Sequence, residues 1–461
     1  MSTRSWLATV SSQAAIQFTE SIQAYALNKT EHARRRRHLM ELMGSDGIAV
    51  LPAAPERVRS RDTLFDYRPD SDFFYLTGFN EPEAVAVLMP GRPHGEFLLF
   101  CRERNRDKEI WDGARAGPQG AVNDYAADDA FPISDIDEIL PGLLEQSERV
   151  YYPMGVAAEF DQRLLVWINH LNSNRHRGHA PREIVALDHL LHEMRLFKSR
   201  SELSLMRKSA QVAARAHTRA MRVCRPGMME YELEAEFLHE FRRNGADCSY
   251  LPIVAGGANA CVLHYRDNDA CLEDGDLVLI DAGCEYQMYA SDITRTFPVN
   301  GEFSPAQRQL YEVVWAANVA ATAAVKPGNH WNDPHLAAVK EITRGLRDLG
   351  ILKGRLPSLI KQQAHAAYFM HRTGHWLGMD VHDVGDYKVA DQWRLLEPGM
   401  TMTIEPGIYI SPHERRVAKR WRGIGIRIED DVAVTREACK VLTTAVPNNA
   451  DDIERLMATA A

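Results

Sequence analysis

The sequence predicts a mixed α/β protein of the α+β kind with two domains. Its 461 residues exceed what a single hydrophobic core usually holds. In the N-terminal half, short β-rich runs alternate with helical or polar stretches, which indicates a domain built around one sheet. In the C-terminal half, two long helical patterns come before strands that end in acidic residues.

The bulk composition excludes several classes of protein. Hydrophobic residues make up 45% and charged residues 25%, as in ordinary soluble globular proteins. A net charge of -9 argues against a nucleic-acid partner. No apolar run approaches the roughly 18 residues of a membrane span. The cysteines are odd in number and form no CxxC pair, which favours a reducing compartment. We therefore expect a cytoplasmic protein with no membrane partner.

Residues 1–30 have neither the basic start nor the long apolar core of a secretory signal, so we expect a poorly ordered extension, with a transit peptide as the alternative. A helix is predicted next, because apolar residues follow the run Arg34 to Arg37 at helical spacing. The four arginines are expected on its solvated face. Gly44 and Gly47 then end it.

The rest of residues 31–197 is predicted to form one α/β domain. It contains no GxGxxG or P-loop motif, and its acids and bases are not grouped like metal ligands. We therefore expect a role as scaffold, in specificity or in assembly. The β-rich runs are residues 47–51, 73–76, 84–89, 97–100 and 150–152.

The second domain, residues 198–461, is predicted to begin just after Phe197, before a long helical pattern. Ser201 is the expected N-cap, and Pro226 with Gly227 ends the helix after Cys224. A second helix is predicted over 230–243, ending at Gly245. Both are expected to cover a sheet.

Two later segments, 275–283 and 399–407, can be laid over each other. Each has a glycine at both ends, an apolar residue at every second position, and a carboxylate in the same place, Asp281 or Glu405. In a strand this periodicity puts alternate side chains on one face. The match favours a duplicated βα unit related by a pseudo-twofold axis, although nine residues leave a chance match open.

A second acidic residue follows each of these two carboxylates in the chain. Asp292 falls in 289–297, which alternates like the return strand of a hairpin, and Glu429 shares a strand face with Arg427. Residues 371–385 then hold three histidines among glycines. Burying four acids without cations would be prohibitive. The candidate ligand set is Asp281, Asp292, His375, Glu405 and Glu429.

The residues near this set could also have ordinary structural roles. Arg427 could form a surface ion pair with Glu429, and Asp380 and Asp383 are expected to structure their loop rather than bind metal. His264, His371 and His382 could be ordinary loop or core histidines. Beside a metal site, such imidazoles position a carbonyl, stabilise an oxyanion or pass a proton to a leaving amine.

Oxygen-rich ligation with one imidazole suits divalent ions such as manganese, cobalt or zinc. The set has no thiolate, and the chain lacks HExxH, so neither a structural zinc site nor a single-zinc peptidase is indicated. Four carboxylates balance two divalent ions, and Arg427 would offset further negative charge. Two metals activate a shared water, which predicts hydrolysis of an amide or a phosphate.

In their order and local sequence, these ligands resemble the pita-bread metallopeptidases, and most of all aminopeptidase P, the Xaa-Pro aminopeptidase family. The resemblance covers nearly everything after about residue 30, and the motifs are specific as a group. They are Asp70-Ser71-Asp72-Phe73-Phe74-Tyr75-Leu76-Thr77-Gly78-Phe79, Leu263-His264-Tyr265, His375-Trp376-Leu377-Gly378-Met379-Asp380-Val381-His382-Asp383, Thr403-Ile404-Glu405-Pro406-Gly407 and Gly425-Ile426-Arg427-Ile428-Glu429-Asp430.

The resemblance implies a creatinase-like N-terminal domain and a pita-bread catalytic domain. It implies two manganese ions, with cobalt or zinc as alternatives, and attack of a metal-bridging hydroxide on the Xaa-Pro carbonyl of a peptide. By position, Asp281 would bind one metal, His375 and Glu405 the other, and Asp292 and Glu429 would bridge.

It further implies that Glu405 accepts a proton. His264, His371 and His382 would handle substrate, with His264 and His382 also taking part in catalysis. Arg427 and Tyr409 would lie beside the metals, and the chain would form a homo-oligomer, a tetramer or a dimer.

The segment 372–374 departs mildly from the family pattern, next to His371 and His375. Prolidase, which cleaves Xaa-Pro dipeptides, is the nearest alternative, and methionine aminopeptidase ranks third because it needs no N-terminal domain of this size. A protein that had lost catalysis and only binds is a further alternative, but all five ligand positions hold competent residues.

Overall fold

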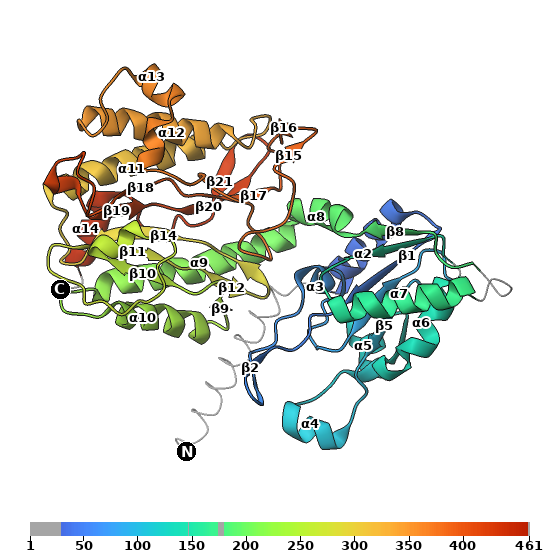
Figure 1. Cartoon of the computed structure of the whole chain (residues 1–461). Coiled ribbons are helices and arrows are strands. Elements are labelled where there is room, and N and C mark those ends of the chain that lie inside the picture. The colour runs from blue at the N-terminus through green and yellow to red at the C-terminus, as the bar shows by residue number, and fades with distance from the viewer. Residues whose placement is uncertain (1–28, 146, 174–178, 460–461) are drawn as a thin grey trace, which may run out of the picture. The chain divides into compact units, whose positions relative to one another are not determined.

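The computed structural model describes residues 29–145, 147–173 and 179–459, so the extension expected over 1–30 lies almost wholly outside the described residues. The chain divides into two compact units, Leu27–Met194 and Arg195–Ala461. The division falls within helix α8 (Asp188–Leu196), a few residues before the boundary expected after Phe197. Figure 1 colours the chain from blue in the first unit to red at the end of the second.

The N-terminal unit is built on one mixed sheet in the order β6-β5-β4-β1-β7-β8. The central pairs β1–β4 and β4–β5 are antiparallel, and the outer pairs are parallel. A separate hairpin pairs β2 (Val58–Ser60) with β3 (Thr63–Leu64). The sheet strands are β1 (Gly47–Pro52), β4 (Val85–Leu88), β5 (Phe97–Cys101), β6 (Asp129–Pro132), β7 (Arg149–Tyr152) and β8 (Glu183–Ala186).

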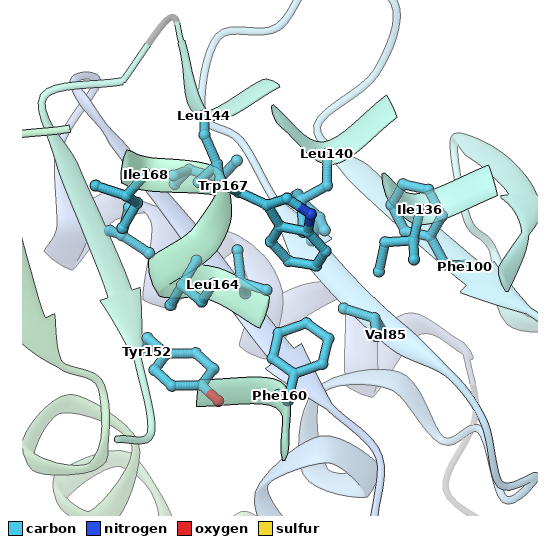
Figure 2. Packing of buried hydrophobic residues seen from close by; sticks show 14 of the residues in the cluster. Val85, Phe100, Ile136, Leu140, Leu144, Tyr152, Phe160, Leu164, Trp167 and Ile168 are labelled. Atoms are coloured by element: carbon cyan, nitrogen blue, oxygen red, sulfur yellow. The ribbon is translucent and has the colours of Figure 1, made fainter. Parts of the chain in front are cut away.

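Seven helices and one 3₁₀ turn are described in this unit. They are α2 (Lys29–Met43), α3 (Ser71–Thr77), α4 (Arg106–Asp112), α5 (Gly117–Tyr125), η1 (Ile133–Asp135), α6 (Ile136–Leu144), α7 (Ala158–Ser173) and α8. Figure 2 shows the core between the sheet and helices α6 and α7, where Trp167 packs edge-on against Phe160. The Trp167 indole N–H donates to Asp137, so its one polar atom is satisfied at the edge of that core.

The strand expected over 73–76 is wrong, because these residues form helix α3. Asp70 caps the helix by accepting from the Phe73 N–H at 2.9 Å, and Gly78 ends it in the left-handed conformation. Phe73, Leu76 and Thr77 are buried at helical spacing. The apolar run was too short to separate a buried helix from a strand.

The expectation of a solvated arginine face on α2 is also wrong for its central pair. Arg35 and Arg36 are 0% and 4% exposed. Their guanidinium groups donate to the carbonyl oxygens of Tyr75 and Leu76, at the end of α3, and Arg36 also reaches Ala126. Arg35 stacks on the Tyr75 ring as well. These arginines tie α2 to α3.

The C-terminal unit places its strands between two helix pairs. In Figure 1, α9 and α10 lie on one side of the strands and α11 and α12 on the other. Helix α9 begins at a capping box made by Ser199 and Glu202, so the N-cap is Ser199 and not Ser201. The helices and 3₁₀ turns are α9 (Arg200–Val223), α10 (Glu230–Arg243), η2 (Gly257–Cys261), α11 (Pro305–Ala324), α12 (Asp333–Asp348), α13 (Leu356–Lys361), η3 (Ala364–Ala367), η4 (Lys419–Trp421) and α14 (Ala450–Ala458).

The strands of this unit form several short antiparallel ladders. The two that carry the acids are β10-β11-β14 and β17-β20-β21, with the pair β18-β19 beside them. The strands are β9 (Asp247–Cys248), β10 (Ile253–Gly256), β11 (Leu277–Asp281), β12 (Cys284–Tyr286), β13 (Tyr289–Ala290), β14 (Thr294–Pro298), β15 (Lys388–Val389), β16 (Gln392–Trp393), β17 (Thr401–Ile404), β18 (Gly407–Ile410), β19 (Ile424–Arg427), β20 (Asp430–Val434) and β21 (Cys439–Val441).

The two matching sequence segments contain strands β11 and β17, which lie in two different three-stranded ladders. Asp281 is the last residue of β11, and Glu405 is the first residue after β17. Their companions, Asp292 and Glu429, lie in the links just before β14 and β20. Asp292 was expected within the return strand, but it lies in the link just before that strand.

No helix in the described part of the chain combines the length and the apolar character needed to cross a bilayer.

Candidate metal centre

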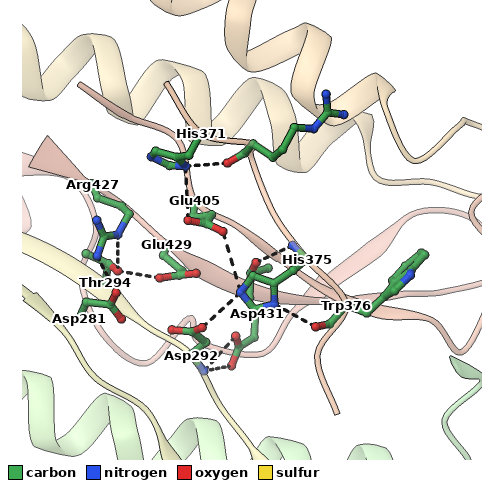
Figure 3. Close-up of polar contacts among 12 residues, drawn as sticks. Asp281, Asp292, Thr294, His371, His375, Trp376, Glu405, Arg427, Glu429 and Asp431 are labelled. Carbon is green, nitrogen blue, oxygen red and sulfur yellow. Dashed lines mark hydrogen bonds and ion pairs between the residues drawn. The ribbon is translucent and has the colours of Figure 1, made fainter. Parts of the chain in front are cut away.

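The strand ladders bring the four acids together. Asp281 on β11 stands opposite Thr294 on β14. The Thr294 hydroxyl donates to Glu429 Oε2 at 2.6 Å, and the Glu429 N–H donates to the Thr294 carbonyl at 3.0 Å. These two bonds hold the link that carries Glu429 against the ladder β10-β11-β14. Figure 3 shows Asp281, Asp292, Glu405 and Glu429 pointing into one space beside His375.

His375 completes this group. Its Nε2 lies 3.4 Å from Asp292 Oδ2 and 3.9 Å from Glu405 Oε1. Ligand atoms of Asp292, His375 and Glu429 all lie within 4.8 Å of one another. Its Nδ1 is 2.9 Å from the Trp376 carbonyl oxygen, which can only accept, so Nδ1 carries the proton. The lone pair on Nε2 therefore faces the carboxylates, as a metal-binding imidazole requires.

The acids repel one another strongly. Burial and then the charge of Asp281 raise the pKa of Asp292 well above its usual range, and burial and then Asp292 do the same to Glu429. Burial, followed by the charge of Glu429, raises the pKa of Glu405 to about 8. Such a cluster is costly without a positive charge at its centre. The oxygen donors and single imidazole fit divalent metal ions.

Tyr250 is a member of the cluster that the sequence analysis missed. Its hydroxyl lies 2.5 Å from Asp281 Oδ1 and also contacts Asp292 Oδ1. A phenol has one hydrogen, so it can satisfy only one of two carboxylates. The other carboxylate receives no hydrogen from Tyr250, so its negative charge would be balanced by a cation. No sequence pattern marks Tyr250, which lies in the link between β9 and β10.

Asp431 was missed as well. It is 1% exposed, and both of its carboxylate oxygens accept from the Asp292 N–H at 3.2 Å. This contact fixes the link that carries Asp292. Its signal in the sequence was its place directly after Glu429 and Asp430, an acid at the start of an apolar strand.

Arg427 is buried inside the site, which excludes the surface ion pair with Glu429. Its Nη2 donates to Asp281 Oδ2 at 2.5 Å and its Nη1 to the Tyr409 hydroxyl at 3.0 Å. Its Nε donates to Thr294 Oγ1, also at 3.0 Å. The guanidinium therefore fixes Asp281 and adds positive charge beside the acids.

His371 faces Glu405 from the other side of the cluster, with Nδ1 3.6 Å from Glu405 Oε2. Its Nδ1 donates to the Arg372 carbonyl, so its Nε2 accepts from the Tyr409 hydroxyl at 2.9 Å. Burial and the nearby Arg427 charge lower the pKa of His371 to about 4. The ring is therefore neutral and is joined to Arg427 through Tyr409.

The other two histidines stand at the solvent side of this group. The His382 ring lies 4.3 Å from the His375 ring, edge to face. Burial and the His375 charge lower its pKa. His264 is exposed on the turn after η2, and its charge lowers the pKa of both His371 and His382. All three predicted substrate histidines thus gather near His375.

Asp380 and Asp383 form ion pairs with cations that are not part of the acid cluster. Asp383 is buried, and it accepts from Lys198 Nζ at 2.9 Å and from Arg195 Nη2 at 2.6 Å. Arg195 also pairs with Asp380. As expected, the two aspartates hold the loop that follows His375.

Two family models match the chain. The model of metallopeptidase family M24 covers residues 204–436, and the model of the aminopeptidase P N-terminal domain covers residues 32–151. The chain is 46% identical over 437 residues to the Xaa-Pro aminopeptidase of Escherichia coli K12, covering 94% of this chain and 99% of that protein. It is 34% identical to human Xaa-Pro aminopeptidase 3, covering 93% of this chain and 86% of that protein.

Solved structures give the same result. The chain is similar to Pseudomonas aeruginosa aminopeptidase PepP with a TM-score of 0.94 and 60% identity, over 95% of this chain and 99% of that chain. It is similar to zinc-substituted E. coli aminopeptidase P in complex with product with a TM-score of 0.92 and 45% identity, over 94% and 99%.

Proposed function

The chain belongs to metallopeptidase family M24, within its aminopeptidase P group, and from this premise we propose how it acts. It is a metal-dependent Xaa-Pro aminopeptidase, which releases the N-terminal residue of a peptide whose second residue is proline. One observation carries the proposal: the carboxylates of Asp292, Glu405 and Glu429 lie around Nε2 of His375, and Asp281 is joined to Asp292 through Tyr250.

The five residues would hold two divalent ions. Asp281 would bind one ion, His375 and Glu405 the other, and Asp292 and Glu429 would bridge them. This assignment is supported by the central place of Asp292 and Glu429 and by the contact of Asp281 with Arg427. We propose manganese as the ion, with cobalt or zinc as alternatives, because the donors are mainly carboxylate oxygens.

Two divalent ions supply an activated water and a polarised carbonyl oxygen when they are bound. Glu405 would accept a proton there, and its pKa, raised to about 8 before metal binding, shows how strongly its place resists negative charge. His382 and His264, on the solvent side, would hold the carbonyl oxygen and pass a proton to the proline nitrogen. Neutral His371, with Tyr409 and Arg427 behind it, would position the substrate.

The N-terminal unit would support assembly. Its helix α4 exposes Ile110 and Trp111 at 74% and 86%, and apolar groups of this size on a surface favour a protein contact. We propose that these residues meet another copy in a homo-oligomer, a tetramer or a dimer. A cytoplasmic location is proposed from the seven cysteines, all of which are free thiols.

The test is metal analysis of the purified protein together with cleavage of an Xaa-Pro-Yaa peptide and an Xaa-Pro dipeptide. We expect about two divalent ions per chain and faster release of Xaa from the longer peptide. A strong preference for the dipeptide would favour prolidase instead, and no cleavage by the metal-loaded protein would favour a binding protein without catalysis.

A further inference from the structure

A cavity of about 620 Å³ lies beside the proposed metal centre. Arg372, Lys388 and Trp393 form part of its wall, together with Gly374 and Tyr387. Its volume is in the range of pockets that bind small ligands. None of the metal ligands lines it, so it is a separate feature with its own chemistry.

The cavity adjoins the metal centre through one loop. Arg372 directly follows His371, and Gly374 directly precedes His375. The Tyr387 hydroxyl accepts from the Trp376 N–H at 3.3 Å. Burial, followed by the charges of Asp383 and Glu405, raises the pKa of Tyr387. A substrate at the metal centre would therefore have this cavity next to it.

Two cations share one aromatic ring in this cavity. The Arg372 guanidinium carbon lies 4.9 Å from the centre of the Trp393 ring, and Lys388 Nζ lies 4.7 Å from it. Arg372 also donates to the Asn332 side-chain oxygen. Across residues 29–145, 147–173 and 179–459, neither cation forms an ion pair with a carboxylate. Asp386 also lines the cavity, which leaves an excess of one positive charge.

The wall is held in place before any ligand arrives. His330 Nδ1 donates to the Trp393 carbonyl at 2.7 Å, and the Trp331 N–H donates to the Arg394 carbonyl at 2.8 Å. The Tyr387 ring stacks on Trp376, with ring centres 5.6 Å apart. The hairpin β15–β16, which carries Lys388 and Trp393, is thus fixed to the segment before α12. The backbone that carries Lys388 and Trp393 is therefore ordered before a ligand binds, which lowers the entropic cost of binding.

We propose that this cavity binds a carboxylate of the peptide substrate beyond its proline, held by Arg372 and Lys388. The inference rests on the proposed function and names the substrates that the site prefers. In Xaa-Pro-Yaa the carboxylate is the α-carboxylate of Yaa or an acidic side chain at that position. In an Xaa-Pro dipeptide the carboxylate is on proline itself, one residue closer to the metals, at most about 3.6 Å of extended chain.

The experiment compares kcat/KM of the metal-loaded protein on four peptides. They are Xaa-Pro-Ala as the free acid, Xaa-Pro-Ala-amide, Xaa-Pro-Asp-amide and Xaa-Pro-Lys-amide. We expect the free acid, the Asp-amide or both to exceed the Ala-amide by about tenfold, mainly through KM, as for one charge-assisted contact. The free acid and the Asp-amide separate the terminal carboxylate from an acidic side chain.

The matched variants are Arg372→Gln, Lys388→Gln and the two together. The double variant is expected to bring the free acid and the Asp-amide down to the value of the Ala-amide, while kcat on the Ala-amide stays unchanged. Arg420→Gln is the control, because Arg420 lies over the Trp421 ring at 4.8 Å but does not line the cavity. It should keep the full preference for a carboxylate.

Three results would overturn the inference. One is equal kcat/KM for acid and amide peptides in the unchanged protein. Another is a preference that survives in the double variant. The third is a preference for the Lys-amide, which would assign the cavity to Asp386. Cleavage of the Ala-amide in any of these cases would leave the proposed function intact, and failure to cleave all four peptides would remove the proposed function itself.

Discussion

At the scale of single residues, a substitution of Glu405 should affect catalysis without affecting the stability of the fold. Glu405 follows β17 directly and is held there by its N–H, which donates to the Thr373 carbonyl at 2.9 Å. We predict that Glu405→Gln reduces kcat by at least about a thousandfold, because the amide cannot accept a proton and binds metal poorly. The nearly isosteric change should leave the thermal midpoint of the metal-free protein close to its original value.

The check is peptide cleavage together with a thermal melt. Glu397→Gln is the matched control, since Glu397 is exposed and lies eight residues upstream, away from the cluster. Full activity in Glu405→Gln would contradict the assigned role.

Tyr250 acts through the ligands that it touches. Its hydroxyl lies against both Asp281 and Asp292, and its one hydrogen bonds to and orients one of these carboxylates. We predict that Tyr250→Phe weakens metal affinity by about 10- to 100-fold, the usual effect of losing a group that orients metal ligands. Titration calorimetry with Mn²⁺ measures it, and Tyr231→Phe on exposed Tyr231 serves as the control. An unchanged affinity for Mn²⁺ would mean that Tyr250 only packs against the cluster and does not orient the metal ligands.

At the scale of elements, the loop between His375 and β15 depends on one buried ion group. Asp383 accepts from Lys198 and from Arg195, and all three side chains are almost fully buried. Asp383→Asn would leave these two cations underpaired. We predict a loss of about 3–5 kcal/mol in the free energy of unfolding, as for other broken buried ion groups. Chemical denaturation measures the loss.

Asp391→Asn is its control, because Asp391 is exposed and its φ of 62° suits asparagine. A loss no larger than in the control would mean that the ion group contributes no net stability.

The same group gives stability a dependence on pH. Burial alone would raise the pKa of Asp383, but Lys198 and Arg195 outweigh it and hold the pKa below its usual range. A carboxyl with a depressed pKa in the folded state stabilises the fold fully above its unfolded pKa of about 3.9, and loses that contribution as pH falls further. The difference in unfolding free energy between the unchanged protein and Asp383→Asn should therefore shrink below about pH 4. A difference that stays constant down to pH 2 would contradict the assignment.

At the scale of the whole molecule, the metal centre joins elements that are far apart in sequence. Its acids come from the end of β11, the residue after β17 and the links before β14 and β20, and its imidazole comes from the loop after η3. Removing the ions would leave the acids to repel one another. We predict that chelation abolishes activity and lowers the thermal midpoint, because ions that bind only the folded state stabilise it by mass action.

Manganese should restore activity better than zinc or magnesium, and the midpoint should rise with the ion's concentration. Magnesium serves as the control for charge alone. Retained activity after exhaustive chelation would end the proposal of a dinuclear centre.

The sequence by itself predicted the two-domain α/β architecture and the acids and histidine that the structure brings together. A repeated strand pattern with an acid in the same place predicted β11 and β17, and three histidines within twelve residues pointed to the segment around His375. These signals are local, because the period of a strand and the spacing of ligands depend only on residues that are near one another in the sequence. The same local logic failed at residues 73–76, where four apolar residues suit a buried helix as well as a strand.

Only the tertiary structure decided which groups meet. Arg35 and Arg36 became buried because the carbonyl oxygens at the end of α3 needed donors. Tyr250 joined the cluster of acids without any pattern in the sequence, and Arg427 turned inward to Asp281 rather than outward to solvent. Contacts between distant segments depend on how the ladders register in space, so composition and periodicity predict that acids will be buried but not which partner will meet each one.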